Sequence, residues 1–493
     1  MPVSETSIEP ENETQASSSG KPKVGFVSLG CPKNLVDSEV MMGMLSQAGA
    51  QLTANAEDAD VIVVNTCSFI ESAQQESVNA ILDMTRLKGE GRARKLVVAG
   101  CLVERFRDEI RKNIPEIDAV IGTGELEKIV GAAGIAVSGA PDSPFKILNS
   151  RPEGAAREAQ GRFSRESWDG AIGDLPNYLY DDATPRILTT PGYTAYIKIA
   201  EGCDHPCSFC IIPQIRGKFR SRRFESVIAE AERLARSGVH EITLIGQDTT
   251  CYGEDFDLKD GLALLLEKLT RIEDFRWIRF LYAYPNKITG RLLETIAASE
   301  KICPYIDVPL QHASLSVLKR MKRGAGAEVF LRSIEKMRRV IPHLTLRTSF
   351  IVGFPGETER EFQELCSFVQ EARFDWMGCL GYSDQEGAGA FSLEQKISRS
   401  ETERRRKHLM GIQKKISKKK LRAHIGKEFD LLLEGPSAES ELLLEGRTRM
   451  HAPEIDGKVF INDVAPDAAI QPGQFYRCAI TEAHDYDLIA KII

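Results

Sequence analysis

The chain has 493 residues, of which 42% are hydrophobic, and its formal net charge is −7. This length predicts two to four domains with cores of ordinary size, and the negative charge argues against general nucleic-acid binding by the whole chain. No apolar run is long enough to span a membrane, and the N-terminus lacks the basic and apolar regions of a secretory signal. We therefore expect a cytoplasmic protein. In such a protein the eleven cysteines favour metal or redox chemistry over disulfides.

Residues 1–21 are rich in Glu, Ser, Thr, Gln and Asn and are expected to form a solvated tail. Residues 22–138 then repeat a strand–helix pattern. Strands are predicted over 23–30, 59–66 and 94–100, and helices over 37–48, 72–87 and 103–113. This alternation predicts an open parallel α/β sheet.

Each of the three predicted strands ends at a cysteine, namely Cys31, Cys67 or Cys101. Ligands of an open parallel sheet gather at the carboxyl ends of its strands. The three thiols are therefore expected to converge, although they are far apart in the sequence. The alternative is three unrelated cysteines buried as small hydrophobic residues.

Residues 139–188 are rich in Gly, Ala, Ser, Pro and Asp and lack periodicity, which indicates a linker or a long surface excursion. Trp168, Tyr178 and Tyr180 suggest that part of it packs on a neighbour. Residues 189–420 again alternate. Strands are expected at 194–200, 241–245, 277–282, 305–310, 344–353 and 377–382, with helices at 226–237, 258–270, 288–299, 315–321, 328–340 and 359–372. Six such repeats fit a full or partial TIM-like barrel, and we expect a partial (βα)6 barrel.

Residues 400–422 are expected to form one basic helix with acidic residues at its start and cations at its end, as the helix dipole favours. This charge is either a solvated face or a contact with RNA. Residues 421–493 contain short β segments separated by Gly and Pro turns, which indicates a small β-barrel or sandwich. From His424 onward there are six Lys or Arg and thirteen Asp or Glu, a net charge of −7. This is the reverse of the basic footprint of an RNA-binding module.

The central motif of the chain is Cys203, Cys207 and Cys210, a C-x3-C-x2-C run that follows the first barrel strand. Structural zinc needs four ligands, and His205 next to Pro206 is an awkward fourth one. Cysteines at similar short spacings hold iron–sulfur clusters, and three of them leave one iron of a [4Fe-4S] cluster open for a substrate. A non-catalytic iron–sulfur electron carrier and a zinc-stabilised interaction protein remain alternatives on this observation alone.

With Phe209 before the last cysteine, this run resembles the radical S-adenosylmethionine (SAM) superfamily. The resemblance implies that the open iron binds the amino and carboxylate groups of SAM. It also implies that an electron from the cluster cleaves SAM to methionine and a 5′-deoxyadenosyl radical. Candidate SAM contacts implied at the strand ends are Phe209, Gly246, Gln247, Gln311, Arg347 and Gly353. For Arg347 the alternative is an ion pair within the barrel, which we favour slightly, and for Gly246 and Gln247 it is a plain turn.

The order of the predicted domains resembles the methylthiotransferases over residues 23–493, apart from parts of 140–188. The resemblance implies that Cys31, Cys67 and Cys101 hold a second, auxiliary [4Fe-4S] cluster, whose open iron carries the sulfur to be inserted. It also implies a C-terminal domain of the TRAM type. One SAM would methylate that sulfur, and a second would yield the radical that takes a hydrogen from the target carbon. An electron donor of the flavodoxin or ferredoxin type and a sulfur donor are implied partners.

Two branches of this family differ in substrate. One modifies isopentenylated adenosine in tRNA, and the other modifies the β-carbon of an aspartate in ribosomal protein number twelve of the small subunit. This chain resembles the second branch at residues 28–38, 197–207, 245–253 and 449–457. An acidic C-terminal domain also suits a basic ribosomal protein, free or in the small ribosomal subunit, better than it suits RNA. The other cysteines lack a ligand pattern and are expected in the core; they are Cys251, Cys303, Cys366, Cys379 and Cys478.

Overall fold

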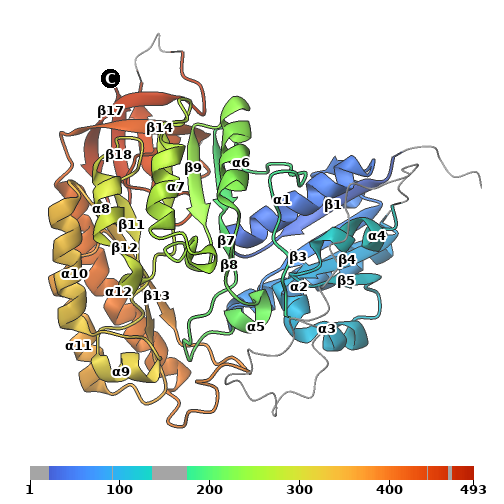
Figure 1. Cartoon of the computed structure of the whole chain (residues 1–493), viewed down its shortest axis with the longest axis horizontal. Helices are drawn as coiled ribbons and strands as arrows, with labels where there is room; N and C mark the ends of the chain where they lie inside the picture. The colour runs from blue at the N-terminus through green and yellow to red at the C-terminus, as the bar shows by residue number, and fades with distance from the viewer. Residues whose placement is uncertain (1–20, 92, 136–174, 441, 465–468) are drawn as a thin grey trace, which may run out of the picture.

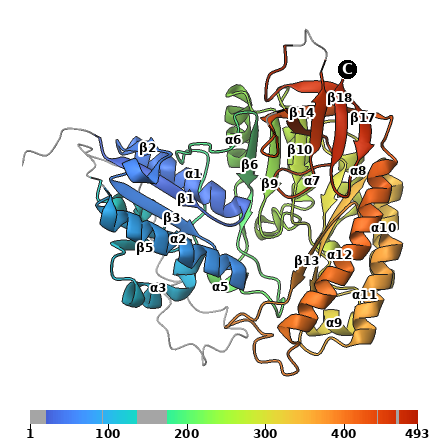
Figure 2. The same ribbon diagram turned by 180° about the vertical axis from the view of Figure 1, so that it is seen from behind.

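The computed structural model describes residues 21–91, 93–135, 175–440, 442–464 and 469–493. In chain order it contains an α/β sheet, an incomplete barrel and a small closed β-barrel (Figure 1; Figure 2). The predicted tail apart from Lys21, and residues 139–174 of the predicted linker, lie outside the described residues. No helix within the described ranges is both long enough and apolar enough to cross a membrane.

The N-terminal unit is a five-stranded parallel sheet with the order β2-β1-β3-β4-β5, which confirms the predicted open α/β fold. Helices α1 and α4 pack on one face and α2 and α3 on the other. The strands are β1 (Lys23–Ser28), β2 (Gln51–Thr53), β3 (Val61–Thr66), β4 (Lys95–Gly100) and β5 (Ala119–Ile121). The helices are α1 (Pro32–Gln47), α2 (Glu71–Glu90), α3 (Cys101–Asn113) and α4 (Ile129–Ala133). The sequence did not predict β2 and β5 because three residues are too few to show a period.

The central unit contains two three-stranded parallel sheets, β10-β9-β6 and β11-β12-β13. A bridge between Ile278 and Ile302, and the N–H of Ala283 donating to the carbonyl of Asp307 at 2.9 Å, join them into one curved wall. Within the described residues β6 and β13 do not pair, so the barrel is partial, as predicted. Its strands are β6 (Thr194–Lys198), β9 (Glu241–Ile245), β10 (Trp277–Phe280), β11 (Tyr305–Asp307), β12 (Thr345–Val352) and β13 (Trp376–Gly381).

Helices on the outside of the wall bury its apolar face in one large core. They are α6 (Phe224–Arg236), α7 (Gly261–Leu269), α8 (Gly290–Ala297), α9 (Leu315–Arg320), α10 (Ala327–Val340) and α11 (Glu359–Ala372). The predicted strand 194–200 is interrupted at Ile199, and β7 (Ala200–Glu201) pairs instead with β8 (Arg220–Ser221). This short hairpin and α5 (Ile212–Arg216) lie between the barrel and the N-terminal sheet (Figure 1).

The predicted basic helix is α12 (Arg399–Arg422), and it packs along the barrel. Part of its charge is neutralised within the protein: Lys414 and Lys418 pair with Asp485 at 2.6 and 3.1 Å. A closed five-stranded barrel follows with the order β14-β15-β16-β18-β17, so the sandwich alternative is excluded. Its strands are β14 (Glu428–Pro436), β15 (Leu444–Arg447), β16 (Val459–Asp463), β17 (Phe475–Ala483) and β18 (Leu488–Ile492).

Buried ion pairs tie the three units together. Arg186, from the described end of the predicted linker, bridges Glu39 of α1 and Glu230 of α6 at 2.6 Å each. Arg447 of the C-terminal barrel makes two hydrogen bonds, of 3.0 and 2.7 Å, to Glu241 of β9. Because all of these side chains are nearly inaccessible to solvent, losing one partner would leave an uncompensated charge in the interior.

Candidate functional site

The three N-terminal cysteines lie together at the carboxyl edge of the sheet. Cys31 is the N-cap of α1, Cys67 follows β3 and Cys101 begins α3. Gly30 has a φ of +89°, and a Cβ at this position would lie 2.9 Å from the sulfur of Cys67. Only glycine therefore allows the Cys31 and Cys67 loops to approach so closely. The structure brings together the three residues that the strand-end argument placed at one edge.

Cations and helix N–H groups surround these thiols. Arg216, at the end of α5, donates from Nη2 to the sulfur of Cys101 at 3.2 Å. Burial raises the pKa of the Cys101 thiol to about 12. At Cys31 burial opposes ionisation, but Lys33, Arg216 and the first N–H groups of α1 outweigh it and lower the pKa. A metal that binds here must therefore displace a proton from Cys101, whereas Cys31 ionises more readily.

The central cysteines lie in the loop between β7 and α5. Gly202 has a φ of +78°, and a Cβ there would lie 2.0 Å from the carbonyl oxygen of Lys218. The N–H of Cys203 donates to the carbonyl of Gly217 at 3.2 Å and that of Cys210 to the carbonyl of Cys207 at 3.2 Å, which folds the loop tightly. Burial raises the pKa of Cys203 to about 11 and that of Cys210 to about 12. Neighbouring thiols of the set add to both shifts.

Each set of three thiols suits an iron–sulfur cluster better than a single zinc ion. Structural zinc takes four protein ligands, and each set offers three thiols. All six cysteines are free, and cysteine thiolates are the usual ligands of iron–sulfur clusters. The donor chemistry of both sets therefore fits the group that the sequence pattern indicates.

The two sets of cysteines face a common region. Helix α5 follows the central loop, and its Ile215 packs against Cys101. Arg216 at its end contacts both Cys101 and, through Nη2 at 3.2 Å, Asn34 of α1. On the barrel side, the segment after β10 carries Tyr282, whose ring lies under the Lys33 ammonium beside Cys31. The mouth of the barrel and the edge of the sheet thus form one site.

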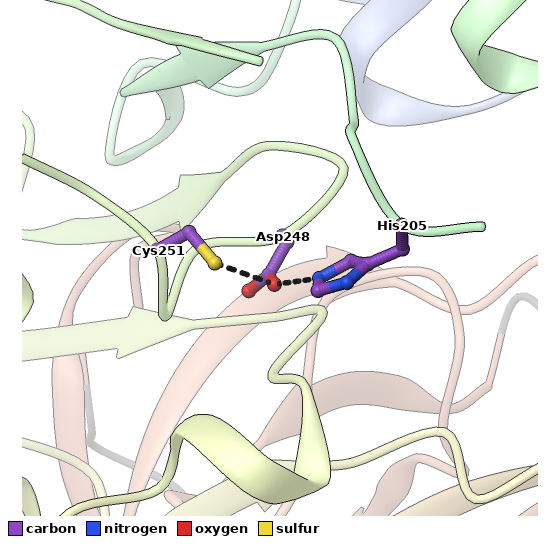
Figure 3. A group of neighbouring side chains, drawn as sticks. All are labelled: His205, Asp248 and Cys251. Carbon is purple, nitrogen blue, oxygen red and sulfur yellow. Dashed lines mark hydrogen bonds and ion pairs between the residues drawn. The ribbon is translucent and has the colours of Figure 1, made fainter. Parts of the chain in front are cut away.

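A hydrogen-bonded group of three side chains joins the central loop to the segment after β9 (Figure 3). His205 Nε2 lies 2.6 Å from Asp248 Oδ2, and the thiol of Cys251 donates to the same oxygen at 3.1 Å. The His205 ring stacks on Tyr284, with 3.7 Å between the ring centroids. Cys251 is buried, as predicted, but the sequence analysis did not anticipate its contact with Asp248. Its position just after Gly246-Gln247-Asp248, at a strand end, was the available signal.

The structure places the predicted SAM contacts in different surroundings. Gln247 lies beside the central loop and donates to Glu201, while Phe209 packs in an apolar cluster with Phe354. Gln311 has a φ of +72° and pairs through its backbone with β12. Gly246 lies against Ala200, and a Cβ on Gly353 would lie 2.2 Å from the hydroxyl of Thr402 on α12.

Arg347 forms the ion pair that the sequence favoured. Its Nη1 lies 2.9 Å from Asp307 of β11, and its Nε lies 3.4 Å from Asp456 of the C-terminal unit. The carboxyl of Asp456 also accepts a hydrogen bond from Tyr305 at 2.6 Å. In this structure the guanidinium therefore joins the barrel to the C-terminal unit.

Three parts of the chain match known protein families. Residues 23–122 match the uncharacterized protein family UPF0004, residues 197–369 match the radical SAM superfamily, and residues 425–493 match the TRAM domain. The last match agrees with the closed five-stranded barrel.

Two curated relatives cover nearly the whole chain. A protein of Koribacter versatilis named "Ribosomal protein uS12 methylthiotransferase RimO" is 67% identical over 98% of this chain and 100% of its own length. A protein of the same name from Solibacter usitatus is 53% identical over 96% of this chain and 95% of its own. Among solved structures, the radical SAM methyltransferase TsrM of Kitasatospora setae, with cobalamin and a [4Fe-4S] cluster bound, superposes with a TM-score of 0.50 at 15% identity. It covers 76% of this chain and 77% of its own, and it supports the fold alone.

Proposed function

Because this chain belongs to the ribosomal protein uS12 methylthiotransferase family and is a radical SAM enzyme, we propose that it transfers a methylthio group to the β-carbon of an aspartate in ribosomal protein uS12. The observation that carries this proposal is the packing of α5, which directly follows the central cysteine loop, against the auxiliary set. Ile215 of this helix packs on Cys101, and Arg216 donates to the sulfur of Cys101 at 3.2 Å. The two cysteine sets are therefore linked through one short helix.

Cys31, Cys67 and Cys101 would hold the auxiliary [4Fe-4S] cluster. Cys203, Cys207 and Cys210 would hold the cluster that binds SAM. When bound, the clusters and SAM supply sulfur, a methyl group and a hydrogen-abstracting radical. Side chains of this protein would orient the clusters and SAM. His205, fixed by Asp248 and by stacking on Tyr284, holds the central loop.

The proposed SAM contacts are Phe209, Gly246, Gln247, Gln311, Arg347 and Gly353. The position of Gln247 supports its role, because its partner Glu201 is two residues from Cys203. The apolar packing of Phe209 would exclude water from one side of a radical site. Arg347 would exchange its ion pairs with Asp307 and Asp456 for a contact with SAM.

The proposed domains are a tail (1–21), an auxiliary-cluster domain (22–138), a linker (139–188), a radical SAM core (189–420) and a TRAM-type domain (421–493). The matched family segments and the element order support these boundaries. A ribosomal substrate implies that the protein acts in the cytoplasm. Two reducible clusters imply an electron donor of the flavodoxin or ferredoxin type, and the transferred sulfur implies a sulfur donor.

Mass spectrometry of ribosomal protein uS12 from a strain lacking this gene tests the proposal. The protein from the parent strain should carry the mass of one methylthio group in place of a hydrogen, and the protein from the deletion strain should lack it. The tRNA of both strains should be identical. Loss of a tRNA methylthio group with unchanged uS12 would refute the proposed substrate in favour of the tRNA branch.

Anaerobic reconstitution tests the ligands. The wild-type chain should bind about eight irons, which is the content of two [4Fe-4S] clusters, and Cys203→Ala should lose about half of them. Cys366→Ala, a buried cysteine of α11 outside both sets, is the matched control and should keep the full load. A full iron load in Cys203→Ala would contradict the assignment.

A further inference from the structure

Lys33 occupies the junction between the auxiliary cysteines and the barrel. It is the second residue of α1 and comes two residues after Cys31, and its side chain is nearly buried, with 9% of the residue exposed. Its ammonium nitrogen lies 3.3 Å from the centre of the Tyr282 ring, which belongs to the barrel. A single cation therefore spans the space between the two units.

Other buried cations near the site have carboxylate partners. Arg216 Nη1 lies 2.5 Å from Asp37 Oδ2, and the Lys198 ammonium pairs with Asp37 and Glu201. Among the residues that the structure describes, no carboxylate forms an ion pair with Lys33. An aromatic face compensates a desolvated ammonium only in part. The neighbours of Lys33 are the Tyr282 ring and the Cys31 thiol, whose ionisation it favours. No carboxylate is among them, so the described surroundings leave a place for one.

The partner of Lys33 is held in an unfavourable backbone conformation. Tyr282 has a φ of +64°, which is a rare value for a bulky side chain. Two hydrogen bonds fix it there, since its N–H donates to Asp307 Oδ2 at 3.0 Å and its carbonyl accepts from the N–H of Thr249 at 3.2 Å. Strain of this kind persists where the surrounding structure requires one orientation. Here it directs the Tyr282 ring to Lys33.

The same segment also reaches the other cysteine set. Tyr284, two residues after Tyr282, stacks on His205, which lies between Cys203 and Cys207. Lys33 therefore faces the place where a substrate must lie if it is to meet chemistry at both sets. A target side chain would enter this space between the two cysteine sets.

We propose that Lys33 binds the carboxylate of the target aspartate and is the residue that recognises its charge. The inference rests on the proposed function. The β-carbon of an aspartate is bonded directly to the carboxyl carbon, so a fixed cation on the carboxylate also fixes the carbon to be modified. An ammonium of this kind discriminates charge, because a neutral amide would leave it buried without an anion. Lys33 is a binding residue in this account.

Binding measurements on the anaerobically reconstituted full-length chain test the proposal. The probes are ribosomal protein uS12 with the target aspartate and the same protein with asparagine at that position, and calorimetry gives both dissociation constants. The wild type should bind the aspartate form about tenfold more tightly. In Lys33→Met the ratio should fall to about one, and Lys33→Arg should retain part of it.

Lys287→Met is the matched control. Lys287 lies in the segment after β10 that also carries Tyr282, but it pairs with Glu254 at 2.8 Å and is partly exposed. This variant should therefore keep the full ratio. Iron content and the cluster absorption spectrum of each variant show whether the sites remain intact. If Lys33→Met fails to fold, Lys33→Arg and the wild-type ratio still provide the test.

Two results would overturn the proposal. An unchanged ratio in Lys33→Met, with an altered cluster spectrum, would mean that Lys33 serves the Cys31 thiolate instead of the substrate. A wild type that binds both forms equally would show that the carboxylate is not recognised. Failure of the proposed function is distinguishable, because uS12 would then carry no methylthio group in the parent strain.

Discussion

The C-terminal barrel should open locally when its buried ion pair with the radical SAM core is broken. Arg447 and Glu241 are 3% and 0% exposed in their side chains, and two hydrogen bonds join them. In Arg447→Met, Glu241 would keep Thr194 at 3.1 Å and Arg279 at 3.4 Å. Removing one partner of a buried ion pair costs about 3–5 kcal/mol of stability. Because Glu241 keeps these two contacts, we expect a loss at the lower end, about 3 kcal/mol.

Hydrogen exchange of the β14 and β15 amides is the appropriate assay, because a chain of several domains does not unfold in two states. A loss of about 3 kcal/mol corresponds to roughly 100-fold faster exchange. The matched control is Arg477→Met in the same barrel, where the pairs with Glu428 and Asp430 are about half exposed. That variant should lose less than about 1 kcal/mol.

The double variant Glu241→Gln with Arg447→Met separates pairing from burial. It should be more stable than the sum of the two single losses predicts, because that sum counts the loss of the Arg447–Glu241 pair twice. Arg279, which also pairs with Glu241, loses its carboxylate equally in the double variant and in Glu241→Gln. Equal exchange in Arg447→Met and Arg477→Met would refute the argument that burial decides the strength of this contact.

Three further predictions concern the cysteine loop and pH. Asp248→Asn should weaken the hold on His205 and release iron from the central set to a chelator roughly tenfold faster, measured against Cys366→Ala; an unchanged rate would contradict a supporting role for Asp248. Gly202→Ala should abolish iron binding at the central set, because its Cβ would lie 2.0 Å from a carbonyl oxygen. The control is Gly238→Ala, where φ is +97° and nothing lies within 4 Å of the added Cβ. This control should cost only about 1 kcal/mol of stability and should keep its iron. Burial, together with Arg447 and Arg279, lowers the pKa of His451 from 6.5 to about 3, so its contribution to stability is fully present above pH 6.5 and is lost as the pH falls below it. The free energy of local opening of the C-terminal barrel, measured by hydrogen exchange, should decrease by about 1.4 kcal/mol per pH unit more in the wild type than in His451→Gln between pH 6 and 4. Parallel curves for the two proteins would exclude this group.

The sequence by itself determined the kind of chemistry and the order of the units. Cys203, Cys207 and Cys210 lie within eight residues, so their convergence needs no tertiary information. Cys31, Cys67 and Cys101 are far apart, but parallel strands bring their carboxyl ends to one edge, and this local rule was enough to place them together. Most helices and strands followed from their periods. The short strands β2, β5 and β8 and the five-residue helices α4 and α5 did not, because they are too short to show a period.

Only the tertiary structure decided which side chains meet across the units. Lys33 lies on the ring of Tyr282, and Arg216 donates to Cys101, although each pair is separated by more than 100 positions in the chain. No period or motif records such a pair, because its energy depends on the relative placement of two separately folded units. The partner of Arg347 shows the same limit: the sequence favoured an ion pair within the barrel, and the packing of the C-terminal barrel added Asp456 to it.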